Sequence, residues 1–153
     1  MTLPTTIFDV YDGLAELGRA WPVDRTASGE EFVDNGAKQT RRWMLWIGNA
    51  TDGGTETNLA TDLAGGSSRE ESFSIEWAIV GKDGRSGMTP ERLRDELRAY
   101  VERLQTLLVA DHTLGGACTW CTLSVEFVDH GTTEAGSLAR VGGAFEILSL
   151  IEP

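Results

Sequence analysis

The sequence predicts an α+β fold, with a mainly antiparallel sheet of about four to five strands and two helices packed on one face. Three observations lead to this prediction. Apolar and polar residues alternate over residues 73–79, which is the period of a half-buried strand. An apolar stripe at spacings of three and four covers residues 89–110, which is typical of an amphipathic helix. Two strand-like segments then follow in succession, and strands joined directly by a turn pair antiparallel.

Length and charge limit the class of protein. With 153 residues, the chain is expected to form one domain, residues 1–153, whose core needs neither a metal nor a disulfide. Thirteen basic and 24 acidic side chains give a net charge of −11. Such a surface disfavours binding to phosphate backbones and to anionic membranes. No segment has the character of a membrane span or a signal peptide, so we expect a cytoplasmic protein with reduced thiols.

The first helix is predicted to follow Thr6, a suitable N-cap, and to end at Pro22. Residues 22–40 are predicted to be irregular. The segment "RRWMLWIG", residues 41–48, is predicted to be a strand that is apolar on both faces, with Trp43 on one and Trp46 on the other. Such a strand lies either in the centre of a sheet or at a subunit contact, so both tryptophans are candidate interface residues.

A long flexible loop is predicted over residues 49–70, which consist mainly of Gly, Thr, Asp, Asn and Ser. A loop of this length in a compact domain is either functional or disordered, and its composition does not decide between the two. We include Asn58, Leu59 and Leu63 among the candidate interface residues.

The strongest helix signal begins at Thr89, the predicted N-cap, with Pro90 at the first helical position. Its apolar stripe is interpreted as a core face rather than a cofactor site. The segment "CTWCTLSVEFVD" is predicted to be a strand, and a glycine turn at residues 131–136 leads to a last strand over residues 138–151.

Every cysteine and histidine of the chain lies between residues 112 and 130, which raises the possibility of a zinc-binding module. The four side chains have the spacing H-x5-C-x2-C-x8-H (His112, Cys118, Cys121 and His130). Residues three apart in a strand point to opposite faces, about 10 Å apart. Two sulfurs on one zinc lie within about 4 Å of each other. We therefore expect no metal and no cofactor, with Cys121 in the core and Cys118 incidental in a loop.

Signatures of catalysis are also weak. Asp111 and His112 are adjacent, and neighbouring residues rarely form the Asp–His bond of a triad. The chain has no G-x-S-x-G nucleophile motif and no phosphate-binding glycine loop that opens a helix. We expect no enzymatic activity and name no catalytic residue.

The most informative segment joins the long helix to the strand after it. From residue 69 the chain reads "REESFSIEWAIVGKDG", then "TPERLRDELRAYVERLQTLLVADHTLGG", then a strand, a glycine turn and a final apolar strand. This arrangement resembles the tail-terminator (tail-completion, minor tail) proteins of long-tailed bacteriophages. The match is most specific in the family's L-x-A-D-x-T-L-G-G segment, which is met here by Leu108, Ala110, Asp111, Thr113, Leu114, Gly115 and Gly116. The family commonly has proline where this chain has His112.

The resemblance implies a structural virion protein. Tail terminators are small α+β subunits that form a ring, usually a hexamer, at the head-proximal end of the tail. The ring stops polymerisation of the tail tube and joins it to the head connector. The implied partners are other copies of the chain, the major tail tube protein and the head–tail connector protein. DNA would pass through without specific binding, and assembly would take place in the host cytoplasm. Another head–tail joining protein, such as a neck or tube-like subunit, stays open as an alternative.

Overall fold

The computed structural model describes residues 6–20, 25–28, 41–51, 58–61, 67–134 and 136–151. Within these ranges the chain forms two helices and six strands of one sheet. The elements in order are α1 (Ile7–Ala20), β1 (Arg25–Ser28), β2 (Arg41–Thr51), β3 (Asn58–Thr61), β4 (Ser67–Asp83), α2 (Pro90–Ala110), β5 (Trp120–Thr133) and β6 (Gly136–Ile151).

The described strands follow the order β1-β2-β4-β6-β5, and β3 pairs separately with β4. Every pair is antiparallel except β1 with β2, which is parallel. The long strands β4 and β6 form the centre, and β5 forms one edge. The predicted α+β class with a mainly antiparallel sheet is therefore confirmed.

Two short strands were not predicted, and they raise the strand number to six. β1 lies in the segment predicted to be irregular, and β3 lies in the segment predicted to be a loop. β2 also continues to Thr51 and β4 begins at Ser67, so both ends of the predicted 49–70 loop belong to strands. The sequences RTAS and NLAT have no apolar alternation that would predict a strand. Each of these short strands forms by pairing with a longer neighbour. Residues 52–57 and 62–66, including Leu63, lie outside the described residues.

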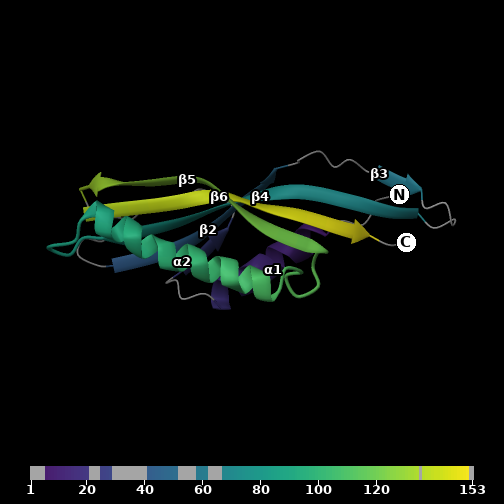
Figure 1. Cartoon of the computed structure of the whole chain (residues 1–153), viewed down its shortest axis with the longest axis horizontal. Helices are drawn as coiled ribbons and strands as arrows, with labels where there is room; N and C mark the ends of the chain where they lie inside the picture. The colour runs from purple at the N-terminus through teal and green to yellow at the C-terminus, as the bar shows by residue number, and fades with distance from the viewer. Residues whose placement is uncertain are drawn as a thin grey trace.

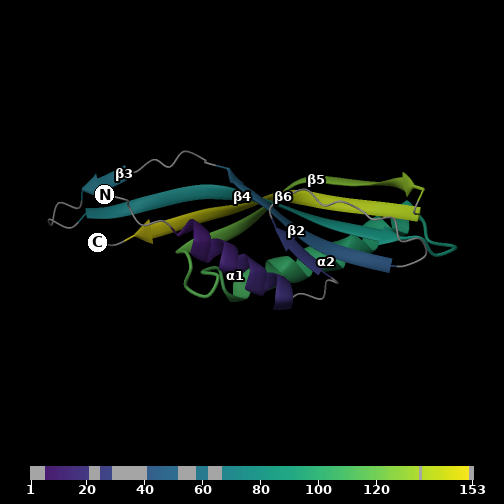
Figure 2. The same ribbon diagram turned by 180° about the vertical axis from the view of Figure 1, so that it is seen from behind.

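Both helices lie on the same side of the sheet, as predicted (Figures 1 and 2). α1 contacts β1 and β2, whereas α2 contacts β4, β5 and β6. The core fills the space between the two layers. It takes Val10 and Leu14 from α1 and four leucines from α2, and the sheet contributes alternate residues of β2, β4 and β6, among them Leu45, Ile47, Phe73, Ile75, Trp77, Ile79, Val141, Phe145 and Ile147. The apolar stripe of α2 is a core face, as the sequence indicates.

The start of α1 is hydrogen-bonded to side chains of β4 and β6. α1 begins directly after Thr6, whose backbone N–H and hydroxyl donate to Oε1 of the buried Glu71 at 2.9 and 2.8 Å. The Thr6 hydroxyl also lies 2.8 Å from the hydroxyl of Ser149 on β6. A carboxylate from β4 thus satisfies the donors that a helix leaves open at its N-terminus.

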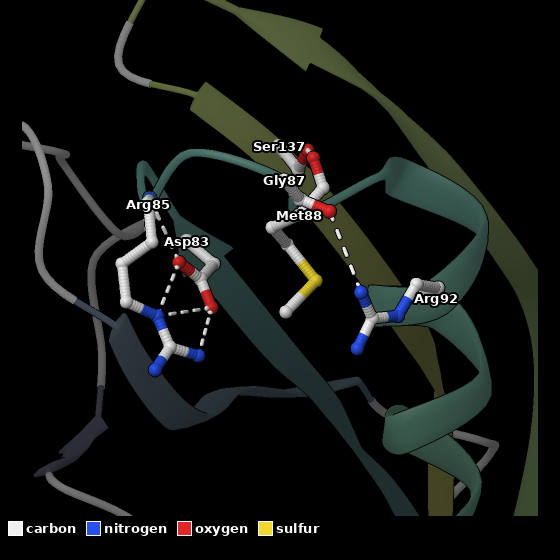
Figure 3. A network of polar contacts seen from close by, with 6 residues as sticks. All are labelled: Asp83, Arg85, Gly87, Met88, Arg92 and Ser137. Atoms are coloured by element: carbon white, nitrogen blue, oxygen red, sulfur yellow. Dashed lines mark hydrogen bonds and ion pairs between the residues drawn. The ribbon is translucent and has the colours of Figure 1, made fainter.

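The turn from β4 into α2 is held by a polar network (Figure 3). The Asp83 carboxylate is buried, and it accepts from the backbone N–H and the guanidinium of Arg85 at 2.7–3.1 Å. The Ser137 hydroxyl donates to the Met88 carbonyl at 3.2 Å. Thr89 caps α2 by accepting from the backbone N–H of Arg92, as predicted, and Pro90 opens the helix.

Candidate functional site

The segment that carries the family resemblance forms a single hydrogen-bonded turn between α2 and β5. The Asp111 carboxylate accepts from the backbone N–H and the hydroxyl of Thr113 through Oδ1, at 3.0 and 2.6 Å. Its other oxygen accepts from the backbone N–H of Gly115 at 2.8 Å. The Thr113 hydroxyl in turn accepts from the N–H of Gly116 at 3.1 Å. Four of the five predicted turn residues therefore share one network.

The backbone conformation of the turn determines where Leu114, the fifth residue, points. Its φ of 52° is left-handed, which costs a branched side chain free energy, and the two following glycines also have positive φ. This turn directs the Leu114 side chain into the core, where it is buried. A Cβ at Gly13 of α1 would lie 2.9 Å from the Cβ of Leu114. The turn thus packs against the first helix as well as joining α2 to β5.

The hydrogen bonds at Asp111 lower the pKa of its carboxyl, with the Thr113 hydroxyl as the largest cause. A lowered folded-state pKa means that the ionised form stabilises the turn above the unfolded pKa, and that this contribution is lost as the pH falls through the folded value. We therefore expect Asp111→Asn to be less stable than wild type at pH 7. The difference in the free energy of unfolding between the two proteins should become smaller when unfolding is measured below about pH 4. An equal difference at both pH values would contradict this account.

The candidate zinc ligands do not form one set. Cys118 precedes β5 rather than lying within it, and both thiols are buried in the core. Cys118 therefore lies in a loop, as expected, but its side chain is not incidental, because it is buried in the same core as Cys121. Cys118 Sγ lies 3.7 and 3.6 Å from the carbonyl oxygens of His112 and Thr113, to which it donates. His130 is nine residues beyond Cys121 on the same strand, or about 30 Å at 3.3 Å per residue. Among the described residues no group of three or more His, Cys, Asp or Glu side chains is placed to hold a metal ion.

Burial raises the pKa of Cys118 to about 11 and that of Cys121 to about 12. At pH 8 about one Cys118 thiol in a thousand would be ionised, and the thiolate is the reactive form. We expect iodoacetamide to label both cysteines at least about a hundredfold more slowly in the folded protein than in urea. Mass spectrometry of a time course would measure this, and rapid labelling of the native protein would show that the thiols are accessible.

A groove runs between α2 and the edge strand β5. It consists of two hollows of about 480 and 440 Å³ that share Gln105. Val101 of α2 and Val125 and Val128 of β5 line the first hollow, together with two arginines and two carboxylates of α2. The second lies beside the turn, where the His112 and Trp120 rings are 4.5 Å apart. Exposed apolar side chains bordered by charged ones are typical of a surface that binds another protein.

The predicted interface residues lie elsewhere. Trp43 is 3% exposed and its ring stacks on Tyr100 at 4.4 Å, so the structure places it in the core of the subunit. Trp46 is half-buried on the opposite face of β2. Asn58 and Leu59 lie on β3, opposite Glu70 and Arg69 of β4. Contact of Trp46, Asn58 and Leu59 with another subunit stays a prediction.

The sequence prediction missed the exposed valines of β5. Val125 and Val128 are three apart, yet both lie on the helix-covered side of the sheet, opposite Gly143 and Val141. A register shift between Val125 and Phe127 makes this possible. The signal in the sequence was the broken alternation of "SVEFVD", where two apolar residues are adjacent.

Comparison with known proteins gives a weak structural likeness. No protein-family profile and no curated protein sequence matches the chain. A sheath/tube terminator of an extracellular contractile injection system, PVC, solved by electron cryomicroscopy in the extended state, is similar in structure. The two are 10% identical with a TM-score of 0.42, and the likeness covers all of this chain and 59% of the other. The chain therefore spans about three fifths of that protein. In the part of the chain that the structure describes, no helix is long and apolar enough to cross a membrane.

Proposed function

We propose that this protein is a structural tail terminator, which forms a ring on the end of a tail tube, stops its growth and joins it to the head connector. The proposed partners are other copies of the chain, six in a ring by analogy with the resembling family, together with the major tail tube protein and the connector. The proposed location is the head-proximal end of a virion tail, after assembly in the host cytoplasm.

The observation that carries the proposal is the turn at residues 111–116. Each residue type that the family segment specifies has a physical task here. Asp111 accepts three hydrogen bonds, the Thr113 hydroxyl donates one and accepts one, and Leu114 enters the core. Gly115 and Gly116 supply positive φ. At position 112, where the family commonly has proline, the turn uses the backbone carbonyl, which accepts from Cys121 N–H at 2.8 Å and which proline also carries. Each residue of the resembling segment therefore has a structural role in this chain, which supports the proposal.

A role in assembly rather than catalysis also fits the groove. Its first hollow is lined by four valines and a leucine together with two arginines, two carboxylates and Gln105, and such a mixture of apolar and charged groups suits packing against another protein surface. The clearly lowered carboxyl pKa values, at Asp111 and Asp129, are explained by local hydrogen bonds that hold the turn and the strand pair β5–β6. These groups have structural tasks already.

The test is to add the purified protein to polymerising tail-tube subunits from the same genome and to measure tube lengths by electron microscopy. We expect tubes to become shorter as the ratio of terminator to tube subunit rises, with added density at one end. An unrelated acidic protein of similar size is the control. Incorporation along the whole tube would favour the alternative tube-like subunit, and unchanged tube lengths would refute a terminator.

A further inference from the structure

The first hollow of the groove is an uncovered part of the subunit's own core layer. Val125 and Val128 lie on the same face of the sheet as the buried Val141, but they are 46% and 54% exposed. They are exposed because α2 does not extend over the edge strand. Within the described sheet, β5 also has no strand on its outer side. A long edge strand with exposed apolar side chains normally needs a cover.

The helical period determines where the charged residues of α2 lie relative to the hollow. At 100° per residue, Arg94 and Arg98 of α2 lie beside Val101, and Asp95 and Glu102 lie farther round the helix. The two guanidinium groups are thus closer to the apolar floor than the two carboxylates are. Arg94 pairs with Asp95 at 3.3 Å, so an occupant of the hollow would meet apolar surface first, and its carboxylates would share Arg94 with Asp95 and reach Arg98 beside it.

The outer face of α1 has the opposite character. Phe8 is 76% exposed, and Asp12 and Glu16 follow it at one and two helical turns on the same exposed face. Glu16 also pairs with Arg19 at the end of the helix. An exposed aromatic ring followed by carboxylates is the pattern of a helix that inserts one anchor into a groove and pairs at its rim.

The two surfaces face opposite edges of the sheet. α1 contacts β1 and β2, whereas the groove lies over β5, at the other end of the strand order. A contact between two different patches on opposite sides of a subunit is head-to-tail, and repetition of such a contact generates a ring when the rotation closes.

We propose that the ring contact seats α1 of one subunit in the α2–β5 groove of the next, with Phe8 against Val101, Val125 and Val128, and with Asp12 and Glu16 beside Arg94 and Arg98. This contact rests on the proposed ring function. The occupant is a second copy because the chain itself carries the complementary helix. At a net charge of −11, two such chains repel each other unless a contact brings arginines against carboxylates, and this one does. It also covers the edge of β5.

The experiment measures self-association of the full chain by sedimentation velocity across a protein concentration series, with and without tube subunits. Phe8→Ala is expected to weaken association by about thirtyfold, the effect of losing an aromatic anchor. The double variants Arg94→Glu/Arg98→Glu and Asp12→Arg/Glu16→Arg are each expected to weaken it by about tenfold or more. Mixing the two double variants should restore association, because each then supplies the charge that the other lacks.

Arg103→Glu is the matched control, since it lies 180° round α2 from Arg94 and makes the same charge change outside the groove. Circular dichroism checks that the variants, all at the surface, stay folded. Equal effects of Arg103→Glu and the groove variants, no recovery on mixing, or no association under either condition would overturn the contact. If tubes are still capped when the groove is reversed, the contact fails and the terminator function stands. If association follows the expected pattern but tubes are not capped, the function fails and the contact stands.

Discussion

Replacing Trp77 with alanine is expected to lower the free energy of unfolding by about 3–5 kcal/mol. Trp77 is 1% exposed and lies in the middle of β4, between Ile47 of β2 and Gly143 of β6. Its ring centroid is 6.0 Å from that of Phe145. Alanine would leave a cavity beneath the long strands that form the centre of the sheet. Because domains are stable by only about 5–15 kcal/mol, this change would remove about a fifth or more of the total.

Trp77 also has a polar role. Its indole Nε1 donates to the carbonyl of Ser124 on β5 at 3.2 Å, across the intervening strand β6. Trp77→Phe keeps most of the apolar volume and loses this bond, so we expect a smaller loss than for alanine. Trp120→Ala, at a half-exposed position, is the surface control. Urea unfolding followed by circular dichroism gives all three values, and a Trp77→Ala cost no larger than that of Trp120→Ala would contradict this placement.

Gly143→Ala is expected to cost about 3 kcal/mol, at the upper end of the usual range for overpacking. A Cβ at position 143 would collide with the backbone of Ser124, the residue whose carbonyl accepts from Trp77. The atoms that this Cβ would meet belong to the backbone of β5 and not to a flexible side chain. The clash is therefore relieved only by moving β5 away from β6. That movement would also break the indole hydrogen bond.

Gly131→Ala provides the matched control. Gly131 lies on β5 with open space where a Cβ would be built, so alanine there should change stability by less than about 0.5 kcal/mol. The same urea titration measures both variants. Equal stabilities of the two variants would show that the approach of β5 to Gly143 is not needed for the fold.

The sequence predicted those elements whose pattern comes from burial along a single segment. β4 shows apolar alternation and α2 shows an apolar stripe, so local residues were enough to predict both elements. The N-cap of α2 also followed from local residues. β1 and β3 have four residues each and gain their order from a neighbouring strand, which no local pattern records. Trp43 lies in the core against Tyr100, which is 57 positions later in the chain. No local sequence pattern predicts that contact.

The candidate site divides in the same way. The turn at residues 111–116 could be predicted because Asp, Thr and Gly have strong local roles in turns. The groove could not, because it depends on where α2 stops relative to the edge of the sheet and on a register shift in β5. The burial of Cys118 was missed because it depends on how the loop before β5 folds back onto the core, which no local pattern records.

The bonds that join Thr6, Glu71 and Ser149 have a consequence for the timing of synthesis. The bonds to Glu71 span 65 positions, whereas the bond to Ser149 spans 143, so this last bond forms only after β6 has left the ribosome. Contacts between such distant residues form late, since the loop between them must close first. A nascent chain that lacks β6 would hold the start of α1 by Glu71 alone, and the completion of β6 would then add the Ser149 hydroxyl to that anchor.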